Sequence, residues 1–225
     1  MKSLLHPCLL VGAVVFSSAC GTKTNVLGGS DVYLAEHQIL SDIKINSLRV
    51  RHVSLKDDSC MSGRSEHLEL SGPIGPDSSE VVSRVLSQVK QCQVNQSKSI
   101  LLNSSGGLLK DGYRLGQIFK NAQVSVLVGG GQVCASSCAI AFLGGKYRMM
   151  LRDAKLIFHA PYIPNGSSIE CKSKSESQEM KGYFANFMGA KDGDFLFERT
   201  MSFCSRSEGW TINSDAAKLF GITTN

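Results

Sequence analysis

The chain has 225 residues, of which 42% are apolar and 19% are charged. This length suits one domain with a substantial core, and the composition is that of a globular protein rather than a disordered one. The formal net charge of +5 is spread along the chain. Because it forms no arginine-rich block or basic stripe of the kind that nucleic-acid binding uses, we expect no nucleic-acid partner.

Residues 1–20, "MKSLLHPCLLVGAVVFSSAC", have the pattern of a targeting segment. Lys2 supplies the positive start, and the apolar stretch 9–16 is too short for a permanent membrane-spanning helix. The segment resembles a bacterial lipoprotein signal in which Cys20 is the lipidated residue, although Ser17 stands where leucine is usual. Ordinary signal cleavage and an uncleaved anchor are the alternatives. All three predict export, and we expect a periplasmic protein that is lipid-anchored to an envelope membrane if Cys20 is modified.

Residues 21–40 lack periodicity and are interpreted as a tether, followed by one domain over 41–225. The stretch 42–55, "DIKINSLRVRHVSL", alternates apolar and polar residues and predicts a strand or hairpin. A second short strand is predicted at 67–74. Valines and a leucine on one face predict a helix over 78–92, with Ser78 or Ser79 as its N-cap.

Strands and helices then alternate along the chain. Strands are predicted at 98–103, 123–128 and 154–161, and helices at 108–122 and 136–145. This alternation indicates an α/β fold with a parallel sheet and helical crossovers. The tail predicts helices over 175–190, 193–204 and 214–221, the last with Gly221 at its stop.

Six cysteines follow the targeting segment, namely Cys60, Cys92, Cys134, Cys138, Cys171 and Cys204. An even number in an oxidising compartment favours up to three disulfides, with fifteen possible pairings. The sequence has no C-x-x-C and no histidine at zinc-ligand spacing, so we expect no metal site.

Three strand-to-helix junctions carry chemically useful residues: Gly106–Gly107, Ser136–Ser137 and His159. Sites in parallel α/β sheets form at such junctions. A serine, a histidine that takes its proton and backbone amides that face an oxyanion are the parts of serine acyl transfer. Taken singly they also suit a helix cap, a half-buried histidine and a turn. The triple glycine at 129–131 is not followed by the Lys-Ser/Thr of a phosphate loop.

Residues 67–162 resemble the Clp protease proteolytic-subunit superfamily, which shares its fold with the crotonases. "LSGPI" matches the entry strand and "LNSSGG" the family's N-S-P-G-G, with Ser105 in place of proline. "GQVCASSCAIAFLGGKYRMMLRDAKLIFHAPY" matches the nucleophile helix, connecting strand and histidine strand in order. The C-x-S-x-C element is similar to an exported, periplasmic-type branch. The resemblance implies a spiral of strand-strand-helix units with a helical C-terminal part.

The resemblance also implies roles for single residues. Ser136 corresponds to the nucleophile, His159 to the general base, and the amides of Gly106 and Ser137 to the oxyanion hole. The family's acid aligns near Gly209, where the neighbourhood offers Glu208 first and Asp215 second. Such a carboxylate would orient the histidine and stabilise its protonated form.

The function expected from this resemblance is an exported serine hydrolase, most simply a peptidase, that works without ATP and without a cofactor. Its partners would be a protein or peptide substrate and further copies of itself in a homo-oligomer. A catalytically degenerate envelope interaction protein is the main alternative. An acyl-CoA enzyme of the crotonase group is a third, against which export argues because coenzyme A is cytosolic.

Overall fold

The computed structural model describes residues 37–60, 62–93, 96–205 and 208–224. The predicted targeting segment, Cys20 and most of the predicted tether lie outside the described residues. Within them, no helix combines the length and the apolar character needed to cross a membrane.

The chain enters a six-stranded sheet through an antiparallel hairpin. Strand β1 (His37–Ile45) pairs with β2 (Leu48–Lys56), which pairs antiparallel with β3 (Arg64–Ser71). The order is β1-β2-β3-β4-β5-β7, and β4 (Ser99–Asn103), β5 (Ser125–Val128) and β7 (Tyr147–Met150) continue from β3 as parallel strands. Strand β1 begins inside the segment predicted as tether, because His37 already pairs with Leu55.

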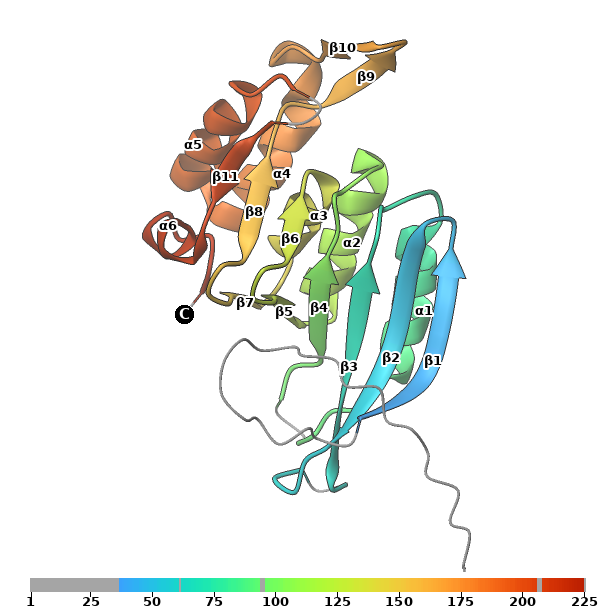
Figure 1. Cartoon of the computed structure of the whole chain (residues 1–225). Helices are drawn as coiled ribbons and strands as arrows, with labels where there is room; N and C mark the ends of the chain where they lie inside the picture. The colour runs from blue at the N-terminus through green and yellow to red at the C-terminus, as the bar shows by residue number, and fades with distance from the viewer. Residues whose placement is uncertain (1–36, 61, 94–95, 206–207, 225) are drawn as a thin grey trace, which may run out of the picture.

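A second, three-stranded sheet has the order β11-β8-β6. Strands β6 (Val133–Ala135) and β8 (Lys155–Phe158) are parallel, and β11 (Trp210–Ile212) returns antiparallel to β8. Just after β8, strands β9 (Tyr162–Asn165) and β10 (Ser168–Cys171) form a separate hairpin that projects from the body of the molecule (Figure 1).

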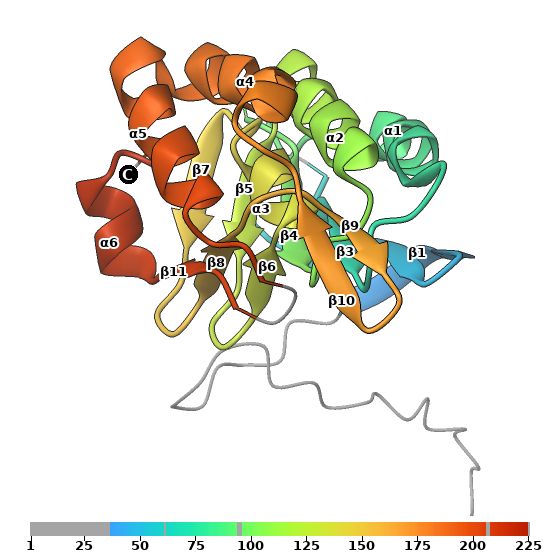
Figure 2. The same ribbon diagram turned by 90° about the horizontal axis from the view of Figure 1, so that it is seen from above.

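Helices line one side of the sheets. Figure 2 shows α1 (Ser78–Gln88), α2 (Leu109–Asn121), α4 (Gln178–Met188) and α5 (Ala190–Met201) in a row along that side. A short 3-10 turn (Ser175–Ser177) leads into α4, and α6 (Ser214–Leu219) closes the chain. Gly221 follows α6 with φ +64°, the left-handed stop that its position predicts.

Helix α3 (Ser137–Phe142) lies in the middle of the core, and every one of its residues is buried. It comes very close to α2 because α2 presents glycines toward it. A Cβ added at Gly112 would lie 2.6 Å from the Ser137 carbonyl oxygen, and one added at Gly116 would lie 3.5 Å from the Cα of Ala141. This close approach fixes the position of the residue that precedes α3.

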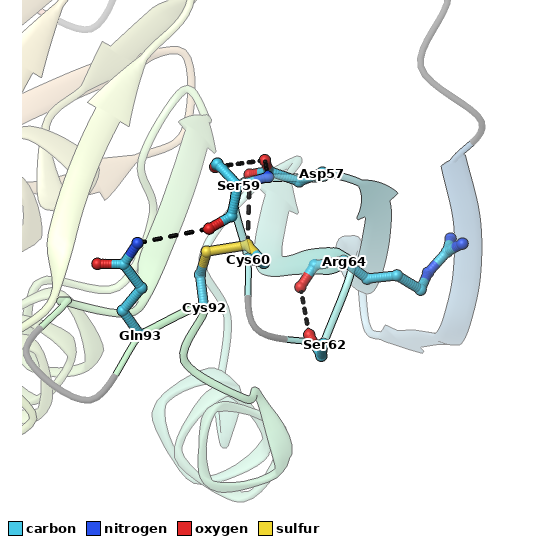
Figure 3. Close-up of a disulfide and its surroundings, with 7 residues drawn as sticks. All are labelled: Asp57, Ser59, Cys60, Ser62, Arg64, Cys92 and Gln93. Atoms are coloured by element: carbon cyan, nitrogen blue, oxygen red, sulfur yellow. Dashed lines mark hydrogen bonds between the residues drawn. A yellow bond between two sulfur atoms is a disulfide. The ribbon is translucent and has the colours of Figure 1, made fainter.

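The six cysteines form three disulfides, Cys60–Cys92, Cys134–Cys138 and Cys171–Cys204. The first joins the β2–β3 loop to the segment after α1 (Figure 3). The second crosses the β6–α3 junction, and the third ties the end of β10 to the segment after α5.

The sequence-based prediction of helix α1 is wrong about its N-cap. The N-cap is Asp77, with φ +62° and no side-chain capping bond. Ser78 and Ser79 both lie inside the helix. Ser78 accepts a hydrogen bond from the Gly75 N–H, and Ser79 donates one to the buried Asp111 carboxylate.

Candidate active site

The ends of two paired parallel strands bring Ser136 and His159 to the same edge of the small sheet. In the β6·β8 pair, Ala135 lies opposite Ile157, so Ser136 and His159 each follow closely on the end of its strand. The Ser136 N–H donates to the Ile157 carbonyl at 2.8 Å, which ties the serine to the histidine strand. The side chains of both residues are partly exposed.

Ser136 occupies a disfavoured backbone conformation, with φ 53° and ψ −123°. A non-glycine residue in such a region costs about 1–3 kcal/mol and persists only when its surroundings enforce it. The sharp turn takes the chain from β6 directly into the buried helix α3. It leaves the serine at the turn's apex, the arrangement of a nucleophile elbow.

Gly106 packs directly against this elbow. Its φ is +90°, and a Cβ added there would lie 2.6 Å from the Ser136 Cβ and 3.1 Å from the Ser137 nitrogen. The loop is held by a bridge between Ser104 and Cys134, in which Ser104 donates to Val133 and Ala135 donates to Ser104. The amides of Gly106 and Ser137 therefore lie beside each other, next to the Ser136 side chain.

The two amides differ in their partners. The Gly106 N–H donates to the Ser104 hydroxyl at 3.1 Å. Ser137 is the first residue of α3, where the helix itself provides no acceptor for the N–H. The Ser137 hydroxyl is fully buried and, in the part of the chain that the structure describes, has no hydrogen-bond partner. The backbone nitrogen, rather than the hydroxyl, is therefore the part of Ser137 that lies next to Gly106.

A backbone carbonyl orients the His159 ring. The Nδ1 atom lies 2.9 Å from the Ala160 carbonyl oxygen, and the ring stacks on Tyr162 with centroids 5.5 Å apart. Because a carbonyl only accepts, Nδ1 must carry a hydrogen, so the neutral form of the ring has its lone pair on Nε2. This is the tautomer that a general base needs. Within the described residues, no hydrogen bond joins Ser136 to His159.

The register of β11 decides where the two candidate acids lie. Trp210 pairs with Phe158, so the same register brings Gly209 level with His159. Glu208 therefore lies at the His159 end of β11, and Asp215 lies beyond the opposite end, in the first turn of α6. Glu208 is exposed, and its carboxylate makes no hydrogen bond with His159 among the residues described. A Cβ added at Gly209 would lie 2.8 Å from the Phe158 carbonyl oxygen, so a side chain there does not fit without movement.

Among the described residues, one group of side chains has potential metal ligands close together, namely Asp57, Cys60 and Cys92. Figure 3 shows the two cysteines joined by their disulfide, with Asp57 beside them. Metals bind the thiolate form of cysteine, which a disulfide removes. The cluster thus has one carboxylate as its remaining ligand.

A family model for Clp protease matches residues 56–187. The chain belongs to the Clp protease family. The match spans the strands, the helices and the glycine loop that build the serine–histidine junction, and the family supports a ClpP-like peptidase. A search of curated proteins found no relative of this chain.

Solved structures show the same fold as this Clp protease family member. ClpP1 from Listeria monocytogenes has a TM-score of 0.52 at 20% identity over 69% of this chain and 86% of its own. A point mutant of the membrane-bound stomatin-specific protease 1510-N has a TM-score of 0.52 at 16% identity, over 69% and 75% of the two chains. The α/β fold of the ClpP/crotonase type expected from the sequence is confirmed.

The Clp protease fold thus brings together Ser136, Ser137 and Gly106, with His159 on the neighbouring strand end, and leaves Asp215 remote. Sequence reasoning missed Ser104, the Ala160 carbonyl and Tyr162. Ser104 lies in the "LNSSGG" motif next to Gly106, so the motif itself offers its hydroxyl as a partner for the Gly106 amide. A backbone carbonyl and a ring stack leave no signal in the sequence.

Proposed function

We propose that this protein is an exported serine peptidase that works without ATP, with Ser136 as nucleophile and His159 as general base. The observation that carries the proposal is the parallel β6·β8 pair, whose neighbouring strand ends carry Ser136 and His159, with Gly106 and the Ser137 amide packed next to Ser136. Membership of the Clp protease family supports the peptidase class.

The proposed reaction is acyl transfer to serine followed by hydrolysis. Ser136 Oγ bonds to the carbonyl carbon of a peptide as its proton passes to His159 Nε2, and the Gly106 and Ser137 amides donate to the resulting oxyanion. His159 then gives that proton to the leaving amine as the C–N bond breaks. Water repeats these steps on the acyl-enzyme and releases Ser136. The oxyanion would replace the Ser104 hydroxyl as the acceptor of the Gly106 N–H.

We propose that two groups share the role of the third catalytic residue, which is to orient His159 and to stabilise its protonated form. The Ala160 carbonyl fixes the tautomer of His159. Glu208, the candidate carboxylate at the correct end of β11, would stabilise the protonated ring from an exposed position. Because water screens an exposed charge, its effect on the rate should be small.

Export and ATP independence are part of the same proposal. Three disulfides within one domain are typical of an oxidising compartment. The proposed compartment is the bacterial periplasm, which has no ATP. Protein or peptide segments are the proposed substrates, homo-oligomerisation the proposed assembly, and lipidation of Cys20 the proposed route to a membrane.

Labelling with a fluorophosphonate probe, which reacts with activated serines, tests the proposal. We expect labelling of the wild type, none of Ser136→Ala, and full labelling of Ser137→Ala. The second variant is a matched control, because the buried Ser137 hydroxyl has no partner to lose and its amide remains. Absence of labelling in the folded wild type, in reducing-agent-free buffer, would contradict the proposal.

One observation favours a second candidate, a ClpP-like protein without catalysis that binds other envelope proteins. The Gly106 amide is engaged by Ser104 rather than free for an oxyanion. If this bond is permanent, peptides would bind without being cleaved. Peptide binding that is equal in wild type and Ser136→Ala, with no labelling of either, would favour this candidate.

A further inference from the structure

The Cys134–Cys138 disulfide crosses the elbow that carries Ser136. Cys134 is the middle residue of β6 and Cys138 is the second residue of α3, so the bond joins strand to helix on either side of the serine. Their Cα atoms are 5.2 Å apart. The disulfide therefore closes a small ring of chain around a residue whose backbone conformation is disfavoured.

The packing of α2 and Gly106 positions the elbow, and two backbone hydrogen bonds hold Ser136 itself. Ser136 donates its N–H to Ile157 and accepts from the Ile140 N–H. Helix α3 has only 6 residues, so it forms few internal hydrogen bonds and depends on restraints from outside the helix to hold its first turn. A strained residue relaxes unless its surroundings fix it. The disulfide supplies the covalent restraint that this short helix lacks.

The burial of the sulfur atoms indicates a positioning role rather than electron exchange. Cys134 and Cys138 are 0% and 1% exposed, whereas Cys204 is exposed and Cys171 partly so. Thiol–disulfide exchange needs access for the attacking thiolate. The Cys134–Cys138 bond is therefore closed to an attacking thiolate, whereas the Cys171–Cys204 bond is accessible to one.

Cys134 also connects the elbow to the oxyanion loop. Its bridge partner is Ser104, whose hydroxyl accepts the Gly106 N–H. At Cys134, the disulfide fixes the strand segment that positions the Gly106 loop. At Cys138, it fixes the first turn of α3 and with it the Ser137 amide.

We infer that the Cys134–Cys138 disulfide is the positioning element of the proposed catalytic centre. It holds the Ser136 hydroxyl and the Gly106 and Ser137 amides in the arrangement that acyl transfer requires. This inference rests on the proposed role of Ser136 and adds a covalent requirement to it.

The test is the kinetics of fluorophosphonate inactivation of a Cys134→Ala/Cys138→Ala variant. Loss of positioning lowers the limiting rate of inactivation and leaves the half-saturating probe concentration nearly unchanged, because only the attack geometry is altered. We expect the limiting rate to fall at least ten-fold. The matched control is Cys60→Ala/Cys92→Ala, which removes a disulfide remote from the elbow and should keep the wild-type rate.

Circular dichroism and thermal unfolding establish that each variant is folded. An unchanged limiting rate in a folded Cys134→Ala/Cys138→Ala protein overturns the inference while leaving the proposed function intact. If that variant does not fold, Cys134→Val/Cys138→Ala restores buried volume. If neither folds, Cys134→Ala and Cys138→Ala are measured singly, because each breaks the bond while changing one side chain, with the same expected fall in rate.

Hydrogen exchange provides a readout that does not depend on activity. We expect amides of residues 133–142 to exchange at least ten-fold faster in the variant than in the wild type, with no change in α5. Equal exchange in the two proteins overturns the inference. If the wild type is never labelled, the proposed function fails, and exchange alone still decides whether the disulfide holds the elbow.

Discussion

At the scale of single residues, the proposed site would act mainly through backbone groups. Gly106 and Ser137 offer amides, Ala160 offers a carbonyl, and Ser136 alone among these offers its side chain. Substitutions that move the backbone should therefore harm activity more than substitutions that trim neighbouring side chains.

Gly106→Ala should lower the rate of fluorophosphonate labelling at least ten-fold. The added Cβ would lie 2.5 Å from the Ala135 carbonyl oxygen and 2.6 Å from the Ser136 Cβ, so the elbow or the loop must move. Gly131→Ala is the matched control, because Gly131 also has a positive φ, +71°, but open space around its Cβ position. It should lose about 1 kcal/mol of stability and keep its labelling rate. Equal labelling of wild type and Gly106→Ala would contradict the assignment of this amide.

Glu208→Gln should lower the labelling rate less than ten-fold, and Asp215→Asn should leave it unchanged. Glu208 is exposed at the His159 end of β11, while Asp215 lies past the other end. Labelling rates of the two variants at neutral pH check this. A larger loss in Asp215→Asn than in Glu208→Gln would show that the register of β11 does not determine the acid.

At the scale of secondary-structure elements, the sequence predicts the helices and several strands, including the short β5 and β8, but it predicts neither β6 nor β11 from a local pattern. The helices at α1, α2 and α4 and the strands β2, β3 and β4 have clear periodicity. Strands β6 and β11 have 3 residues each, too few for any period to be seen. Both are defined by pairing with β8, which is long-range information that a local pattern does not contain.

The same reason explains which parts of the site were predictable. Ser136 and His159 lie at junctions that the alternation of strands and helices makes visible. The local sequence does not decide between Glu208 and Asp215 as the acid, because their positions relative to His159 depend on how β11 pairs with β8. The disulfide pairing was equally undetermined, since sequence leaves fifteen arrangements open.

Tyr183→Phe should weaken the docking of α4 on α3. The Tyr183 hydroxyl donates to the Ile140 carbonyl at 3.0 Å within the core. The Ile140 carbonyl keeps the Leu143 N–H as a donor, so losing this bond should lower the free energy of unfolding by about 0.5–1.5 kcal/mol. Tyr113→Phe is the matched control, because its ring packs on Tyr183 but, in the described part of the chain, its hydroxyl makes no hydrogen bond. Urea unfolding measures both, and equal losses would contradict the role of the hydrogen bond.

At the scale of the whole molecule, Arg148 joins the C-terminal segment to the centre. Its guanidinium donates to the carbonyls of Ile222 and Gly221 after α6 and to those of Leu143 and Gly145 after α3. Burial lowers the pKa of Arg148. Among the residues that the structure describes, the partners of this cation are carbonyl dipoles at the ends of two helices rather than a carboxylate.

Arg148→Met should lower the free energy of unfolding by about 2 kcal/mol and release the C-terminal segment first. Hydrogen exchange should show residues 214–224 losing protection at denaturant concentrations where α2 stays protected. Arg152→Met, an exposed arginine on the neighbouring loop, is the control and should change stability by less than about 0.5 kcal/mol. A cooperative loss with no early release of this segment would contradict the role of Arg148.

The pairing of the disulfides has a consequence for biogenesis. The six cysteines pair consecutively along the chain, first with second, third with fourth and fifth with sixth, so the three covalent loops follow one another and none encloses or interlocks with another. A chain threaded through a membrane from its N-terminus would expose these cysteines in bonding order. An oxidase that joins cysteines as they emerge would therefore produce the native connectivity directly, without the reshuffling by an isomerase that non-consecutive bonds require.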